Sequence, residues 1–247
     1  MKVKNWGRLV ILAIYGIIII IKWNICIWVI LLFATLICIM FINHIAYKIE
    51  DNKFFMATFV RRTLYFIPYI IAYIIRNKYY TNVDEISKFQ KGNILIYSLL
   101  GIIVALLFLA IRLNDFRVLF NKDIISMSPL KTKKTLLNIY SNIGSAVTEE
   151  LFYKGVVFFV LYNYGFGFII SGIVTSLSFM SIHNTQRYSS NFYTFKDYSV
   201  QFLISFIGCM LYLLSGYIAV PMIVHITYNL PMVVNDIMKC RVLAVKK

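Results

Sequence analysis

TLLNIYSNIGSAVTEELFYKGVVFFVLY, residues 135–162, decides the fold, because this stretch is long and apolar enough to span a bilayer yet carries two adjacent acids. A membrane-spanning helix needs about 20 mostly apolar residues. The chain has 247 residues, of which 60% are hydrophobic and 14% are charged, whereas about a quarter of the residues in soluble domains are charged. We therefore predict an all-α fold, a polytopic transmembrane helical bundle.

Apolar runs continue on both sides of this stretch, and they predict about eight spans. The predicted spans cover residues 8–22, 25–43, 57–75, 93–112, 135–162, 166–183, 200–215 and 217–236. The third is the weakest because it contains Pro68, and a surface helix over 44–62 is the alternative for the segment before it. The first run leads into a second apolar run, so we expect a retained span rather than a cleaved signal peptide.

The formal net charge of +15 comes mainly from basic residues in the loops between the spans. Under the eight-span scheme most of the 25 lysines and arginines lie on the side of the N-terminus. This excess predicts a multi-pass protein of the cell membrane with cytoplasmic N- and C-termini. The lipid bilayer is the expected partner of the basic residues, and we do not expect nucleic acid to bind.

Only two of the ten acids, Glu149 and Glu150, lie well inside an apolar run. A charge at the bilayer centre costs about 2.5–3.5 kcal/mol on insertion scales, so such acids are functional by default. Lys154 follows Glu150 by four residues, which places both on one helix face and predicts an ion pair. Glu149 points about 100° away and is left free for chemistry. The alternative for Glu150 and Lys154 is a pair that only locks helix packing.

Two histidines, His183 and His225, lie in later predicted spans. Asn229 follows His225 by four residues, so an imidazole and an amide share one helix face and can both donate to one oxyanion. Phe179 stands four residues before His183 and can wall the same site. A packing role is the alternative for each of these side chains.

The stretch 138–148, NIYSNIGSAVT, is unusually polar for a span. It predicts a helix that lines a cavity open to the cytoplasmic side, and a small-residue packing face is the alternative. At such a site a carboxylate bonded to an imidazole can activate water as a general base. Glu149, His183 and His225 can alternatively bind a metal ion that activates the water. The sequence contains no HExxH motif, so we assert no cofactor and leave metal dependence open.

Three motifs together resemble the CAAX protease and bacteriocin-processing family, called CPBP or Abi. EELFYKG at 149–155 looks like its EExxxR motif with Lys154 in place of the arginine, FMSIH at 179–183 matches its FxxxH motif, and HITYN at 225–229 matches its HxxxN motif. We therefore divide the chain into N-terminal transmembrane helices without a motif, 1–130, and a protease core, 131–240.

The resemblance implies a glutamate-type intramembrane endopeptidase that hydrolyses a peptide or protein substrate at the membrane. By this resemblance Glu149 and His183 would activate water, and His225 and Asn229 would form the oxyanion hole. Glu150 and the basic residue would shape the site. Bacterial relatives are implicated in pheromone and bacteriocin peptide processing. Two other functions stay open: a non-catalytic immunity or regulatory protein that binds through the same helices, and a small-solute transporter with an ion-pair relay.

Overall fold

The structure is a computed structural model that describes residues 6–21, 26–45, 54–79, 89, 92–185 and 194–245. Within these residues the chain is helical and contains no strand, which confirms the predicted all-α class. The long helices are α1 (Trp6–Ile21), α2 (Cys26–Ile45), α3 (Phe54–Tyr79), α4 (Ile94–Ile111), α7 (Thr132–Phe152), α9 (Gly167–Thr185), α11 (Phe195–Ser215) and α12 (Ala219–Val245). The shorter elements are α5 (Leu113–Leu119), α6 (Lys122–Met127), η5 (Tyr153–Phe158), α8 (Phe159–Leu161) and η6 (Tyr162–Phe166). Within the described residues, every predicted span falls on one of the long helices or its direct continuation, and residues 22 and 25 at the ends of the first two spans lie outside them.

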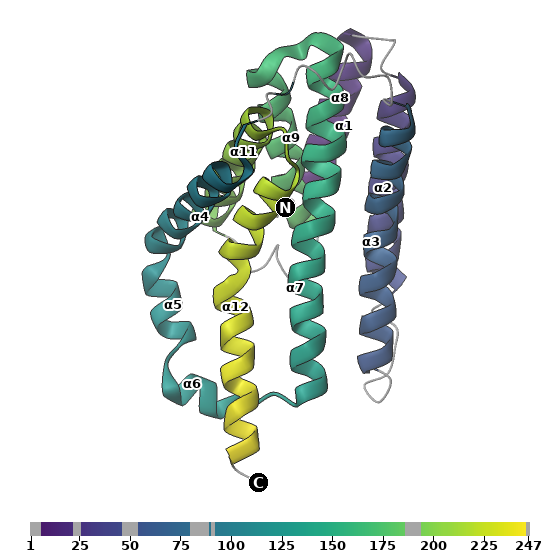
Figure 1. Cartoon of the computed structure of the whole chain (residues 1–247). Coiled ribbons are helices and arrows are strands. Elements are labelled where there is room, and N and C mark those ends of the chain that lie inside the picture. The colour runs from purple at the N-terminus through teal and green to yellow at the C-terminus, as the bar shows by residue number, and fades with distance from the viewer. Residues whose placement is uncertain are drawn as a thin grey trace.

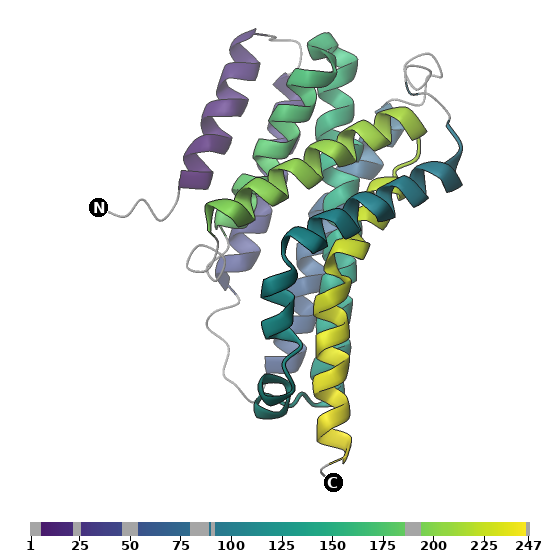
Figure 2. The same cartoon turned by 90° about the vertical axis from the view of Figure 1, so that its left-hand side faces the viewer.

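Helix α7 occupies the middle of the bundle. It packs against α3 on one side and α12 on the other, and successive long helices run in alternating directions (Figure 1). Figure 2 shows α4 and α11 lying obliquely beside the upright pair α7 and α12. Helix α9 packs between α1 and α11. Neighbouring positions on α7 therefore face different helices, which matters for two adjacent acids.

Four segments of the described chain are long and apolar enough to cross a membrane: Thr58–Tyr79, Ile94–Ile111, Thr132–His183 and Phe195–Ser215. A straight helix over the 52 residues of Thr132–His183 would be about 78 Å long, more than twice the hydrocarbon thickness of a bilayer. The chain instead reverses at Gly165 and Gly167, which have φ angles of 85° and 71° that favour glycine. This segment therefore makes two antiparallel passes, with α7 ascending and α9 descending in Figure 1.

Two shorter apolar helical segments, Leu9–Ile18 and Ile27–Ile39, lie within α1 and α2. Large apolar side chains stay exposed on the long helices, such as Leu95 and Leu107 on α4, which are 71% and 61% exposed. Apolar surface on this scale marks contact with lipid. The polytopic membrane bundle is thus confirmed, whereas the total of eight crossings and the cytoplasmic position of both termini stay predictions.

The weakest predicted span belongs to a continuous 26-residue helix, α3, with Pro68 inside it. The alternative of a separate surface helix over 44–62 is wrong for the described residues, because 54–62 are part of α3 and α2 ends at Ile45. Residues 46–53 lie outside the described part of the chain. Proline removes one backbone donor from a helix, and buried packing of α3 against α2 and α7 sustains the helix across it.

The helix that carries the two acids widens directly after them into the π-helical segment η5. Arg76, buried at the end of α3, donates from Nε to the Gly155 carbonyl oxygen over 2.6 Å. Its guanidinium also lies 4.1 Å from the centre of the Phe159 ring. Short π-helical insertions occur mostly at functional sites. Here Arg76 contacts a backbone carbonyl that lies within the widened segment.

We expect Gly155→Ala to destabilise the protein by about 1–3 kcal/mol, the usual cost of overpacking a well-packed core. A Cβ at this position would lie 2.7 Å from a ring carbon of Tyr73. The measurement is thermal unfolding of the purified protein in detergent micelles. Gly16→Ala is the matched control, since a Cβ there meets no atom within 4 Å. Equal melting temperatures for the two variants would contradict this account of η5.

Candidate active site

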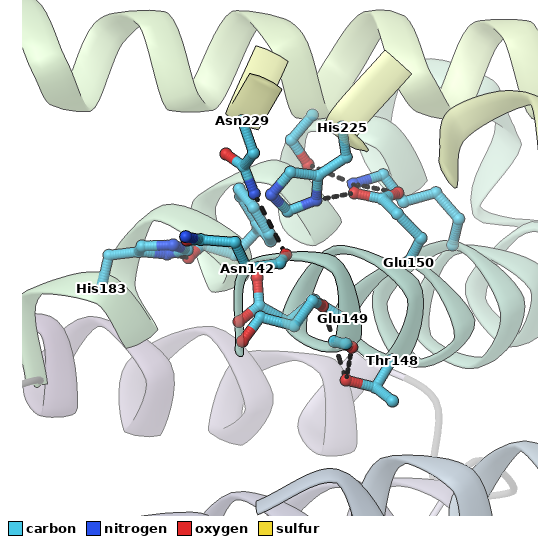
Figure 3. A network of polar contacts seen from close by, with 12 residues as sticks. Asn142, Thr148, Glu149, Glu150, His183, His225 and Asn229 are labelled. Carbon is cyan, nitrogen blue, oxygen red and sulfur yellow. Dashed lines mark hydrogen bonds and ion pairs between the residues drawn. The ribbon is translucent and has the colours of Figure 1, made fainter. Parts of the chain in front are cut away.

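Glu149 and Glu150 lie near the end of α7, and each is only 3% exposed. Figure 3 shows Glu150 directed at His225 of α12, whereas Glu149 extends toward the side on which His183 of α9 lies. The predicted divergence of the two adjacent side chains is therefore present. The two acids have different partners.

Glu150 is the centre of a buried ionic cluster. Lys154 Nζ lies 2.9 Å from its Oε2, and His225 Nδ1 lies 3.0 Å from its Oε1. Lys154 Nζ also donates to Ser205 Oγ of α11 over 3.1 Å and lies 4.7 Å from the centre of the Phe179 ring. The predicted ion pair is confirmed. It differs from a simple helix-surface pair because the same carboxylate also anchors the histidine of α12.

Glu149 contacts α3 instead. Tyr65 Oη donates to Glu149 Oε1 over 3.0 Å, and Tyr69 Oη donates to Tyr65 Oη over 3.2 Å. Both tyrosines are fully buried or nearly so. Sequence reasoning missed them, because two tyrosines four residues apart in an aromatic-rich helix give no signal for a partner far along the chain.

His183 has a hydrogen-bonding arrangement that fixes its tautomer. Its Nδ1 lies 2.8 Å from the Phe179 carbonyl oxygen, one turn earlier on α9. A carbonyl oxygen only accepts, so Nδ1 carries the hydrogen and the lone pair of a neutral ring is on Nε2. The Glu149 carboxylate lies near enough to His183 to interact with it electrostatically.

Phe179 contacts both histidines of the predicted site, and these ring contacts fit a wall of the site and its alternative packing role alike. Its buried ring centre lies 4.8 Å from that of His183 and 5.7 Å from that of His225. The centre of the Tyr153 ring lies 5.2 Å from that of Phe179. Phe179 thus contacts both imidazoles and a tyrosine of η5.

His225 and Asn229 share one face of α12, as their spacing predicted, and Figure 3 shows both side chains reaching from α12 toward α7. The His225 side chain is 14% exposed, and its Nδ1 bonds a carboxylate oxygen, so its other ring nitrogen is directed elsewhere. Asn229 Nδ2 donates to the Asn142 carbonyl oxygen of α7 over 3.4 Å. An amide nitrogen has two hydrogens, so Asn229 keeps one donor for a ligand.

The polar stretch 138–148 contributes to helix packing. Asn138 Nδ2 donates to Asp236 Oδ2 of α12 over 3.0 Å. Gly144 lies against the Phe66 ring of α3, where a Cβ would clash. The small-residue packing face is thus present, and the water-filled cavity stays a prediction.

The alternative metal ligands, Glu149, His183 and His225, do not converge on one point. Across the described residues, no group of three or more histidine, cysteine, aspartate or glutamate side chains has the geometry to hold a metal ion. His225 turns its Nδ1 to Glu150 rather than to Glu149. Glu149 and Glu150 thus bond different partners within one site.

Taken together, the fold and the site define a polytopic helical membrane protein in which ionisable side chains from α7, α9 and α12 gather in one region (Figure 3). Residues 131–231 match the family described as type II CAAX prenyl endopeptidase Rce1-like. The match confirms the predicted family over this segment, and all three motifs lie within it. It supports an intramembrane endopeptidase of the CAAX type. No curated protein and no solved structure matches the chain.

Proposed function

We propose that the protein is an intramembrane endopeptidase in which Glu149 and His183 activate the attacking water. One observation carries the proposal: Glu149 is buried in an apolar bundle and extends toward His183, with His225 and Asn229 beside them (Figure 3). Such an arrangement offers a base and an oxyanion site within one small region, as peptide hydrolysis requires.

The proposed reaction begins when the Glu149 carboxylate takes a proton from a water molecule that His183 Nε2 helps to orient. The resulting hydroxide adds to the carbonyl carbon of the scissile peptide bond. The remaining N–H of Asn229 and the Nε2–H of a protonated His225 stabilise the oxyanion. Collapse of the tetrahedral intermediate breaks the C–N bond, and Glu149 returns its proton to the leaving amine.

Glu150 and Lys154 have supporting roles in this proposal. The carboxylate of Glu150 accepts from His225 Nδ1 and so fixes the orientation of the ring. Lys154 holds the same carboxylate, with its Nζ 2.9 Å from Oε2 and donating to Oε1 over 3.1 Å. Orientation within about 0.5 Å is what separates an effective oxyanion site from a poor one.

The substrate we propose is a peptide or protein cut at the membrane, such as a pheromone or bacteriocin precursor. The family description names prenyl CAAX substrates for its members, which makes a prenylated peptide the natural first probe. A non-catalytic immunity or regulatory protein is the competing function. In that case, the phenotype would survive in a variant that cannot cleave.

The test is cleavage of a quenched fluorescent CAAX peptide, with and without its prenyl group, by the purified protein in micelles. His183→Ala is expected to lower kcat by about 10²-fold, because one partner of the water is lost. His44→Ala, which removes the histidine outside the motifs, serves as the control and is expected to cleave normally. Unchanged cleavage by His183→Ala would overturn the proposal.

Adding a strong chelator to the same assay separates the two mechanisms of water activation. Water activation by Glu149 and His183 predicts unchanged cleavage. Loss of cleavage with chelator, restored by added zinc, would favour a metal-bound water instead.

A further inference from the structure

We propose that Tyr65 is the residue that positions Glu149 for catalysis, and that Tyr69 directs the Tyr65 hydroxyl to it. This assignment rests on the proposed function. It adds a helix to the site, because α3 lies outside residues 131–231, the segment that matches the family.

Tyr65 contacts Glu149 directly. Tyr65 Oη lies 3.0 Å from Glu149 Oε1, and both side chains are buried. Within the described part of the chain, this is the one hydrogen bond made to the Glu149 carboxylate. A hydrogen bond to a charged acceptor is about twice as strong as a neutral one. Tyr65 therefore both stabilises the ionised carboxylate in an apolar setting and restricts its rotation.

The hydroxyl hydrogens of Tyr69 and Tyr65 point the same way along the chain of hydrogen bonds. A tyrosine hydroxyl has one hydrogen to donate and can also accept. Tyr69 Oη lies 3.2 Å from Tyr65 Oη and donates to it. With its oxygen accepting from Tyr69, Tyr65 commits its own hydrogen to Glu149. The two hydroxyls thus form a short directed chain that ends on the base.

Aromatic contacts hold the two tyrosine rings in place. The rings of Tyr65 and Tyr69 meet edge-on at 5.2 Å, and the Tyr69 ring lies 4.9 Å from that of Phe152. Phe152 follows the two acids on α7, so the aromatic contacts connect α3 to the same turn of α7 that carries Glu149. The Glu149 carboxylate is thereby held from α3 through its Oε1.

The test compares Tyr65→Phe with Tyr15→Phe in the cleavage assay with the quenched CAAX peptide. Tyr15 is the matched control, because it is as buried as Tyr65. Its hydroxyl donates over 3.2 Å to Oγ of Ser178, which lies outside the proposed catalytic residues. Tyr65→Phe is expected to lower kcat by about 10- to 100-fold with KM changed less than about twofold, as loss of a bond to a charged group predicts. Tyr15→Phe is expected to keep kcat within about twofold.

Tyr69→Phe provides a second, milder variant that leaves the Tyr65–Glu149 contact in place. Its kcat is expected to fall by about two- to tenfold, the range of a neutral hydrogen bond. Equal kcat losses in Tyr65→Phe and Tyr15→Phe would overturn the assignment, as would a rise in KM at unchanged kcat. Full cleavage by Glu149→Gln, in contrast, would overturn the proposed function itself. Loss in Glu149→Gln with normal Tyr65→Phe would overturn only the role of Tyr65.

Discussion

Replacing Glu149 with glutamine is expected to lower kcat for peptide cleavage by about 10⁴-fold, the upper range for a lost general base. Glutamine has the same shape, and its amide oxygen can still accept from Tyr65, but it cannot take a proton from water. The chain should therefore fold and insert normally. Steady-state cleavage of the quenched CAAX peptide, together with the melting temperature in micelles, measures both parts of this expectation.

Asp115→Asn is the matched control for this substitution, because it makes the same acid-to-amide change at an exposed ion pair with Arg112. Exposed pairs contribute about 0–1 kcal/mol, so both cleavage and melting temperature should stay near those of the unmodified protein. Cleavage by Glu149→Gln at the rate of Asp115→Asn would contradict the role of Glu149. A collapsed melting temperature in Glu149→Gln would instead indicate a structural role for the carboxylate.

The arrangement of the two acids could be predicted because it depends on helix geometry within one segment. Adjacent positions on a helix diverge, and positions four apart face the same way. These two rules placed Glu150 with Lys154 and set Glu149 apart. The same spacing rule brought His225 and Asn229 to one face of α12, which the structure shows directed at α7.

The residues of α3 that contact α7 and η5 could not be predicted, because these contacts join segments far apart in the sequence. Tyr65 and Arg76 reach their acceptors across a helix contact, and no spacing within 54–79 encodes which residues of α7 and η5 they meet. Pro68 also made this span the weakest prediction in the sequence. The same helix nevertheless carries Tyr65, whose hydroxyl donates to Glu149, the proposed base. The π-helical segment η5 escaped prediction too, because hydropathy reports which face is apolar and not how the backbone bonds are spaced.

Lys154→Met is expected to destabilise the protein by about 3–5 kcal/mol, which is the cost of removing one partner from a buried ion pair. Methionine fills similar space but leaves the buried Glu150 carboxylate with His225 as its one partner in the described part of the chain. Unfolding in detergent with added denaturant measures the change. Lys196→Met is the control, because Lys196 is exposed and, within the described residues, its Nζ donates to the Ile111 carbonyl oxygen alone, over 3.2 Å. Its loss should change stability by less than about 0.5 kcal/mol.

The double variant Glu150→Gln with Lys154→Met separates stability from catalysis. Replacing both members of a buried pair is often neutral or stabilising, so most of the stability lost in Lys154→Met should return. Cleavage should recover less, because His225 Nδ1 would then bond a neutral amide instead of a carboxylate that holds its ring. Equal recovery of stability and cleavage would contradict this, and would leave Glu150 and Lys154 as a packing device without a part in orienting His225.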